Sequence, residues 1–360
     1  MGLLMATYAI MQLIFSPIWG SVSDRIGRKP VLLIGVFGNA LAQLLFGFST
    51  ELWMLIAARV LAGILSSATL PTAMAYIGDS TSERDRGGGM GIIGASMGVG
   101  MVLGPGIAGW MATYSLSAPF FLAAILSLIA LVLIVLLLPE SLPQEDREGK
   151  LSKISGLNLK ELWEALFSPI GLLLLMSFLV SFGLTNFESV FGLFANARYG
   201  YGPQRVGGLL TFIGLVSAAV QGGLTGPLTK RWGEATVIKF SLLGSAIGFG
   251  LMLLAASLVG VFLSTGFFIF SNAMLRPSVS ALISRRATLG QGVAMGLNNS
   301  FMSLGRSIGP LWAGFVYDMN ISYPYWSGSV IMLLGFAISM FRLKDDTSLQ
   351  PEDIHPQPNK

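Results

Sequence analysis

The sequence contains no cysteine, a single histidine and few charged residues. Of its 360 residues, 22 are Lys or Arg and 18 are Asp or Glu, which makes 11% of the chain charged, whereas a soluble globular protein carries about 25%. The absence of cysteine excludes disulfides, thiol catalysis and cysteine metal sites, and one histidine excludes an imidazole ligand cluster. The low charge excludes a soluble enzyme, a nucleic-acid binder and a disordered scaffold. Because neither cysteine nor a histidine cluster is present, we expect no metal site, and we expect no cofactor.

Apolar residues and glycine are abundant instead. Hydrophobic residues make up 53% of the chain and glycine accounts for 45 residues. About 20 apolar residues in a helix cross the ~30 Å hydrocarbon core of a bilayer, and in lipid the backbone pairs internally as a helix. Glycine allows such helices to pack closely. The sequence therefore predicts an all-α polytopic membrane protein in the lipid bilayer with eleven transmembrane helices, at 1–20, 31–49, 52–78, 88–112, 118–138, 167–195, 206–228, 236–257, 259–284, 292–317 and 324–342.

The basic residues are distributed unevenly between the two sides of these spans. Seventeen of the 22 Lys and Arg residues lie on the side that carries the tail after residue 342, two lie on the other side, and the remaining three lie within spans. Loops rich in Lys and Arg stay in the cytoplasm. We therefore expect a multi-pass protein of the cell membrane with its C-terminus in the cytoplasm.

The chain repeats itself at an offset of 205 or 206 residues. Gly91, Gly100, Gly104-Pro105 and Gly109 recur with the same spacing at Gly296, Gly305, Gly309-Pro310 and Gly314. This repeat predicts two homologous halves in the same orientation, with an N-terminal half at 1–138, a cytoplasmic linker at 139–166, a C-terminal half at 167–342 and a cytoplasmic tail at 343–360. The span at 167–195 has no counterpart in the first half, so we expect the first of twelve helices to be missing from this chain.

The connection after the first span carries a recognisable motif. It comprises Gly20, Asp24, Arg25, Gly27, Arg28 and Lys29, and it resembles the loop signature of the major facilitator superfamily. The resemblance implies that fold over essentially the whole chain, and it implies a conformational latch in which Asp24 meets the N-terminus of the helix that begins near Gly292. The alternative is a positively charged loop that merely fixes the topology.

The glycine pattern from Gly91 to Gly109 resembles the fifth-helix motif of the drug:proton antiporters of that superfamily. The resemblance implies an exporter of small molecules that is driven by the proton gradient without a cofactor, and we expect it to act as a monomer. The alternative is simple packing of small residues between helices, because the second copy of the pattern shares the spacing.

Three charged residues inside the spans are the candidates for proton coupling and for the walls of a cavity. A charge at mid-membrane costs about 3 kcal/mol and should face a cavity and a partner. The resemblance places Arg59, Glu188 and Arg276 on helices that line the central cavity. We hypothesise that Glu188 takes up a proton and that Arg59 tunes its proton affinity. Alternatively, Glu188 extends to the outer surface or pairs with Arg198. We expect Arg306, in the glycine-rich span at 292–317, to have a structural role such as capping carbonyls of a neighbouring helix.

The sequence thus favours a proton-coupled secondary transporter that exports small amphipathic drugs by alternating access. Two other interpretations stay open. The chain is a metabolite uptake symporter or facilitator of the same superfamily, or it is a non-transporting remnant with eleven helices.

Overall fold

The computed structural model describes residues 2–82, 86–144, 159–286 and 291–343, and within these ranges every regular element is helical. A 3-10 turn at Ser66–Ala68 joins α3 to α4, and a π turn at Val220–Leu224 joins α10 to α11. The helices are α1 Gly2–Ile26, α2 Arg28–Phe48, α3 Leu52–Leu65, α4 Thr69–Ser80, α5 Arg86–Met111, α6 Ala118–Leu137, α8 Leu159–Leu166, α9 Gly171–Tyr199, α10 Pro203–Ala219, α11 Thr225–Trp232, α12 Glu234–Leu254, α13 Leu258–Ala273, α14 Leu275–Arg286, α15 Gln291–Met319 and α16 Tyr323–Arg342.

Each predicted span coincides with one helical unit of the structure. Within the described ranges, ten of these units are long and apolar enough to cross a membrane. The eleventh, predicted at 292–317, is the 29-residue helix α15. Polar residues such as Asn298, Asn299 and Arg306 lower the mean hydropathy of this helix. The prediction of an all-α membrane protein is therefore confirmed.

The helices do not end where the apolar runs end. α1 continues to Ile26, so most of the predicted loop after Gly20 is helical, and α9 covers Gly171–Tyr199 rather than 167–195. A helix satisfies its own backbone groups in lipid and in water alike. Hydropathy therefore locates the edge of the bilayer, whereas the helix continues until a residue such as Gly27 breaks it.

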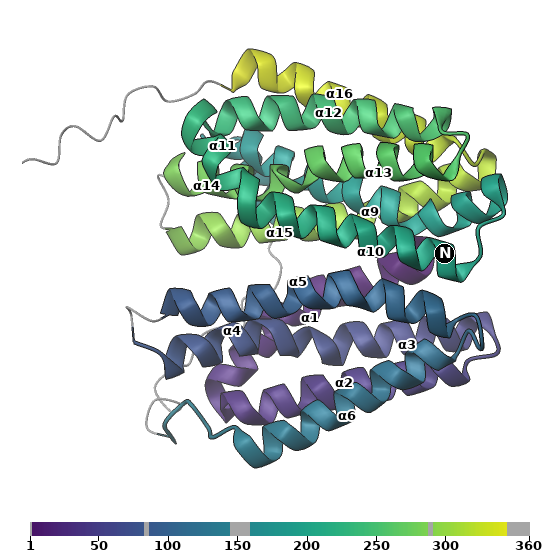
Figure 1. Ribbon diagram of the computed structural model, residues 1–360. Coiled ribbons are helices and arrows are strands. Elements are labelled where there is room, and N and C mark those ends of the chain that lie inside the picture. The colour runs from purple at the N-terminus through teal and green to yellow at the C-terminus, as the bar shows by residue number, and fades with distance from the viewer. Residues whose placement is uncertain (1, 83–85, 145–158, 287–290, 344–360) are drawn as a thin grey trace, which may run out of the picture.

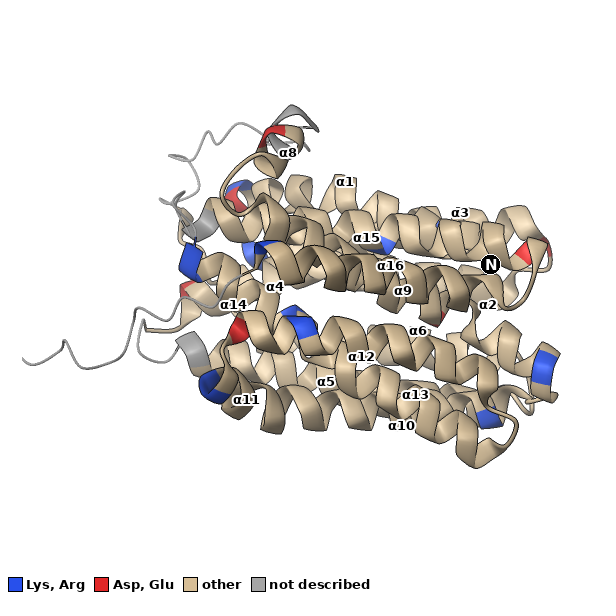
Figure 2. Cartoon of the chain, turned by 90° about the horizontal axis from the view of Figure 1, so that it is seen from above, with Lys and Arg blue, Asp and Glu red and all other residues tan. Residues whose placement is uncertain are grey.

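The helices form two groups, α1–α6 and α9–α16, which are seen one below the other in Figure 1. The last residues of α1, α4, α11, α14 and α16 lie at one end of the molecule, which we call the linker end. We call the other end, with the turn between α9 and α10, the opposite end. The helix α8 stands at the linker end in Figure 2, and its exposed Trp163 packs edge-on against Phe167.

The two groups are homologous halves. α2 and α12 each have 21 residues and begin 206 positions apart, and α6 and α16 each have 20 residues and begin 205 positions apart. Gly27 and Gly233 precede α2 and α12 with positive φ angles of 106° and 79°, a conformation that glycine adopts without strain. The repeat predicted from the sequence thus extends to the helix bounds.

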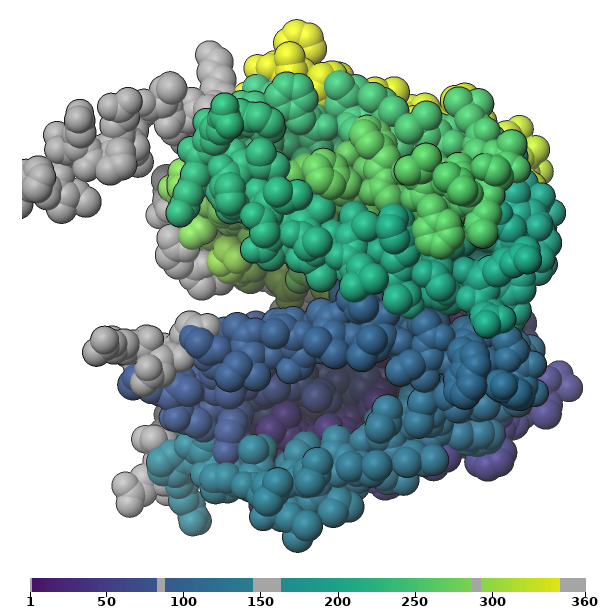
Figure 3. Space-filling model, viewed as in Figure 1, coloured from purple at the N-terminus to yellow at the C-terminus, as the bar shows by residue number. Residues whose placement is uncertain are grey.

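Glycines bring the two halves into backbone contact toward the opposite end. A Cβ added to Gly109 of α5 would lie 2.8 Å from the Cα of Gly207 in α10, and a Cβ on Gly214 would lie 2.9 Å from the carbonyl oxygen of Met101. Gly2 of α1 approaches Pro310 of α15 in the same manner. In the space-filling view the halves touch at this end and diverge toward the linker end (Figure 3).

Replacing Gly207 by leucine tests this contact. The new side chain would collide with the backbone of Pro105 and Gly109, so we expect Gly207→Leu to lower the Tm by several degrees and to separate the halves at the opposite end. The neighbouring Gly208 has no atom within 4 Å of an added Cβ, and Gly208→Leu is the matched control. Equal melting temperatures of the two variants in detergent would contradict the contact.

Candidate transport site

The predicted latch motif forms a network of ion pairs at the linker end. Arg28, only 5% exposed, donates from Nη1 to Asp24 at 2.6 Å and to Ser23 Oγ at 2.6 Å, and from Nε to Asp79 of α4 at 2.8 Å. The carboxylate of Glu140, just after α6, accepts the backbone N–H of Arg28 at 2.8 Å, where the positive end of the α2 dipole favours a negative charge. The network ties together α1, α2, α4 and the segment after α6.

The second half repeats the core of this network with the charges reversed. At the positions 206 residues after Arg28 and Asp79 stand Glu234 and Arg285, and they form an ion pair at 3.1 Å. The position equivalent to Asp24 is occupied by Lys230. The attraction of an ion pair depends on the product of the charges and not on which helix carries which sign. The two halves therefore keep the same link between their equivalent helices with opposite polarity.

The other members of the motif lie around this network. Lys29 donates from Nζ to the carbonyl of Val135 at 3.0 Å, and Arg25 is exposed. A Cβ added to Gly20 would have no atom within 4 Å, so this glycine makes no close helix contact in this conformation. The contact of Asp24 with the helix near Gly292 stays a prediction.

The charges inside the spans are few, and most Lys, Arg, Asp and Glu residues lie toward the helix ends (Figure 2). Arg59 of α3 is half-buried, its guanidinium lies 4.7 Å above the ring of Phe46, and its buried Nε has no hydrogen-bond partner in the described structure. Tyr8 of α1 lies within electrostatic range of both Arg59 and Arg306, and Arg306 lies within range of Arg276. Tyr8 of the first half thus lies near a cation of each half.

Glu188 lies on the α9 face that is not packed into the C-terminal core. Its side chain is exposed, while Phe187, Ser189 and Val190 beside it are buried. Three residues earlier, Thr185 donates to the carbonyl of Gly305 in α15 at 3.3 Å, and four residues later Gly192 faces Val206 of α10. Glu188 is therefore placed on the face of α9 between α15 and α10, the two helices that make the most extensive contacts with the first half.

The structure does not join Glu188 to Arg59. Within the described residues no cation lies within ion-pair distance of the Glu188 carboxylate, so the direct tuning that we expected from Arg59 has no contact to act through. Pairing with Arg198 is also wrong, because Arg198 donates to the carbonyl of Leu253 at 2.7 Å. Arg306 donates to Ser303 of its own helix at 3.0 Å rather than capping a neighbouring helix.

The glycine motif of α5 divides into two parts. Gly109 and the carbonyl of Pro105 form the contact with Gly207 of α10. Gly91, Gly100 and Gly104 have no atom within 4 Å of an added Cβ. The packing role that we considered for this motif therefore holds at one end of it in this structure, and the other glycines line open space.

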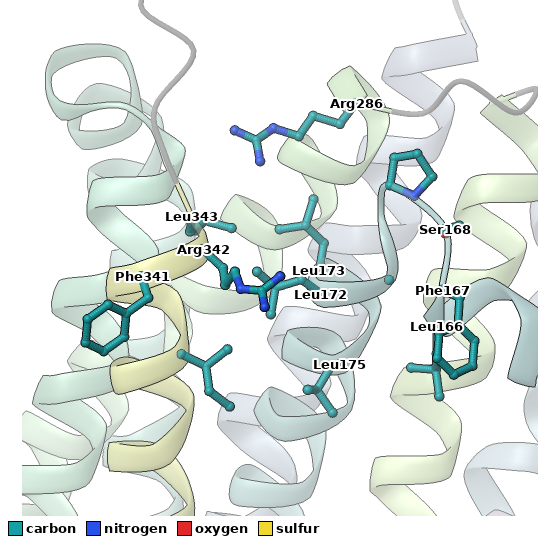
Figure 4. A pocket seen from close by; sticks show the side chains of 13 residues that line it. Leu166, Phe167, Ser168, Leu172, Leu173, Leu175, Arg286, Phe341, Arg342 and Leu343 are labelled. Carbon is teal, nitrogen blue, oxygen red and sulfur yellow. The ribbon is translucent and has the colours of Figure 1, made fainter.

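A cavity of about 680 Å³ lies at the linker end, outside the region of the spanning charges. It is lined by residues of α9 such as Leu172 and Leu175, by Phe167 before that helix, and by Arg286 and Arg342 (Figure 4). None of the residues predicted as site residues lines it. Its walls belong to the C-terminal half and to the segment that joins the halves.

Sequence reasoning missed Asp79, Glu140 and Tyr8. The repeat contained a signal for the first of these, because Arg28 and Asp79 map at the 206-residue offset onto a Glu and an Arg, an exchange of charge that marks a pair in contact. Glu140 and Tyr8 carry no such signal, since each acquires its partners through tertiary packing.

The fold and the placement of charge define a class of protein. Two homologous helical halves that meet at one end and diverge at the other, with isolated charges between them, are the architecture of a secondary membrane transporter.

Comparison with known proteins gives the family. The sequence profile of the Major Facilitator Superfamily matches residues 1–287 and, in a second overlapping match, residues 222–358. The chain belongs to this superfamily. It is similar to multidrug resistance protein 2 of Bacillus subtilis, with 33% identity over 94% of this chain and 85% of that protein. The quinolone resistance protein NorA of Staphylococcus aureus is 27% identical over 98% of this chain and 90% of NorA.

Two solved structures have the same fold. The human organic anion transporter MFSD10 (TETRAN) superposes with a TM-score of 0.70 at 25% identity, covering 94% of this chain and 83% of the other. The nucleoside transporter NupG superposes with a TM-score of 0.80 at 16% identity, covering 95% and 90%. The second likeness concerns the fold alone.

The charge-reversed networks make a testable prediction. Arg28→Glu places three acids together, and breaking a largely buried ion pair costs about 3 kcal/mol or more, here near that lower figure because the side chain of Asp79 is 30% exposed. We expect a clear loss of Tm for this variant. The triple variant Asp24→Lys, Arg28→Glu and Asp79→Arg copies the polarity of the second half and should recover most of the loss in a thermal melt. A triple variant no more stable than Arg28→Glu would contradict the interpretation of the pairs as interchangeable links.

Proposed function

We propose that this chain exports small amphipathic drugs in exchange for protons. The observation that supports this most strongly is its similarity, at 33% identity over 94% of the chain, to multidrug resistance protein 2. The match to NorA supports the same assignment. The exporter acts as a monomer in the cell membrane, needs no cofactor and has its C-terminus in the cytoplasm.

The halves at 1–138 and 167–342 move as units in this proposal, connected by the linker at 139–166. The count of basic residues supports a linker end that faces the cytoplasm. The structure would then be a cytoplasm-open state, in which the contact of Gly109 with Gly207 closes the outer side. Drugs enter from the cytoplasm or the inner leaflet, and rocking of the halves opens this contact and exposes the site to the outside.

Glu188 takes the role of the proton carrier. Its place on α9 between α15 and α10, which make the most extensive contacts with the first half, supports a position facing the space between the halves. A carboxylate without a cation partner in that space is stabilised by taking up a proton. Protonation from outside would then compete with bound drug, while Arg59 and Arg276 shape the electrostatic field of the cavity.

The interpretation as an uptake symporter has less support, because the relatives with the highest identity reported above are named for drug resistance. The interpretation as an inactive remnant is tested by transport itself.

The transport test uses inside-out vesicles that contain the protein and have an acid interior. We expect added lipophilic cations and tetracyclines to discharge the pH gradient, because the drug enters as protons leave. Glu188→Gln should reduce the discharge to the level of vesicles without the protein. Glu51→Gln, which removes an exposed acid at the opposite end, is the matched control and should leave the discharge unchanged. Full activity of Glu188→Gln would remove this residue from the coupling mechanism.

A second candidate substrate class is organic anions. Arg59, Arg276 and Arg306 outnumber Glu188 within the described spans, and unpaired cations in a low-dielectric space attract a negative group. The structural neighbour MFSD10 is named an organic anion transporter.

Arg276→Gln tests this candidate. If anionic groups bind beside Arg276 and Arg306, the variant should lose most of its transport of carboxylate-bearing amphipaths and retain that of cations, measured as the ratio of the two fluxes in the same vesicles. A proportional loss of both fluxes would contradict anion recognition by this arginine.

A further inference from the structure

The cavity at the linker end combines two arginines with apolar walls. Its volume of about 680 Å³ falls within the ~300–1,000 Å³ that is usual for ligand sites. The arginines are Arg286, the last residue of α14, and Arg342, the last residue of α16. Figure 4 shows both guanidinium groups near the ends of their helices, with the side chain of Arg342 reaching from α16 toward Leu172 and Leu173 of α9. One end of the cavity is therefore positively charged.

The walls beside the arginines are apolar and incompletely covered. Ile338 and Phe341, on the last two turns of α16, are exposed, and Leu172 and Leu175, on the first turns of α9, are half-buried. All four line the cavity. Apolar side chains that stay exposed on a membrane helix contact the acyl chains of lipids, so this part of the cavity is suited to an acyl chain.

Exposed aromatic residues mark the depth of the cavity in the bilayer. Phe167 lines it, and Trp163 of α8 packs edge-on against Phe167. Both side chains are exposed. Aromatic residues are enriched where the bilayer meets water. The cavity therefore lies at the level of the lipid headgroups.

The positive charge of the cavity is not balanced by the residues around it. Among the described residues that line it there is no Asp or Glu, and no carboxylate of the described ranges forms an ion pair with Arg342. Gly171, the first residue of α9, also lines the cavity, and the positive end of the helix dipole adds to the attraction for an anion.

The repeat shows that the shared fold does not require these two cations. At the offsets of 206 and 205 residues, the positions equivalent to Arg286 and Arg342 in the first half are Ser80 and Leu137. The link between Glu234 and Arg285, in contrast, has its counterpart in the first half. The arginines of the cavity are thus a feature of the second half alone.

We propose that this cavity binds an anionic phospholipid of the surrounding bilayer, with its phosphate between Arg286 and Arg342 and one acyl chain along Ile338 and Phe341. A guanidinium donates two parallel hydrogen bonds to a phosphate, and basic pockets between transmembrane helices hold anionic headgroups. An acyl chain gains little by leaving lipid for protein, so the charge of the headgroup decides which lipid stays. The site lies outside the transport path proposed above and does not depend on the transported substrate.

The bound lipid connects three parts of the chain. Residues 166–169, in the segment that joins the halves, line the cavity together with the ends of α14 and α16. The lipid therefore holds this segment against the C-terminal half.

The test is native mass spectrometry of the full chain, freed of lipid in detergent and offered phosphatidylglycerol and phosphatidylcholine with the same acyl chains at equal concentration. We expect the wild type to retain one phosphatidylglycerol several-fold more than phosphatidylcholine. The double variant Arg286→Gln, Arg342→Gln should lower this ratio several-fold. Arg231→Gln, which removes an exposed arginine at the same end of the same half, is the matched control and should keep the wild-type ratio.

Two further measurements complete the test. Thermal melting in phosphatidylcholine checks that each variant is folded, and Arg342→Gln alone, at an exposed position, replaces the double variant if that one does not fold. Ile338→Trp fills the apolar part of the cavity without a change of charge. It should lower the retention of phosphatidylglycerol, whereas millimolar inorganic phosphate should not displace the lipid from the wild type.

Four results would overturn the proposal. The first is a wild type without preference for phosphatidylglycerol, and the second is an equal ratio in the double variant and in Arg231→Gln, which would mean binding by net charge alone. The third is full displacement by inorganic phosphate together with no effect of Ile338→Trp, which would mean an anion site without a place for an acyl chain. The fourth is retention that appears only after Asp345→Asn and Asp346→Asn, which would mean that the acids after Leu343 in the sequence occupy the cavity.

Discussion

The close approach of helix backbones at glycine is the interaction on which the rest of this structure depends. In a bilayer apolar side chains gain little by leaving lipid for protein, so helices associate where small residues allow their backbones to meet. Here Gly109 and Gly207 form such a contact between the halves, and Gly305 and Gly309 form another between α15 and α9 within one half. The first contact holds the molecule closed at one end, and its release is the step that alternating access requires.

Charge has a different role at the linker end, where it holds each half together as a rigid body. Arg28 links the start of α2 to the ends of α1 and α4, and Glu234 makes the equivalent link with Arg285 in the second half. The reversal of sign between the halves indicates that the link itself is what the fold requires. Rigid halves with a narrow contact between them transmit a small change at that contact to the far end of the molecule.

The sequence was sufficient to predict the helices, the repeat and the family, because hydropathy and glycine spacing are properties of single segments. It was not sufficient for the site. The family resemblance places Arg59 and Glu188 on helices that line one cavity, yet the structure does not pair them, because a position along a helix does not fix the direction in which a side chain points. Asp79 was missed because an acid at a helix end resembles an ordinary boundary residue. Its partner, Arg28, lies 51 positions earlier in the sequence.

The proposed export cycle requires the glycine contact between the halves to open while the linker end closes. In the cysteine-free chain, one pair of spin labels at Ser115→Cys and Gln204→Cys would report the opposite end, and another at Thr81→Cys and Thr229→Cys would report the linker end. Pulsed electron paramagnetic resonance would measure both distances before and after a drug and a proton gradient are supplied. The account predicts that the first distance grows while the second shrinks. Two distances that stay constant, or that change in the same direction, would contradict it.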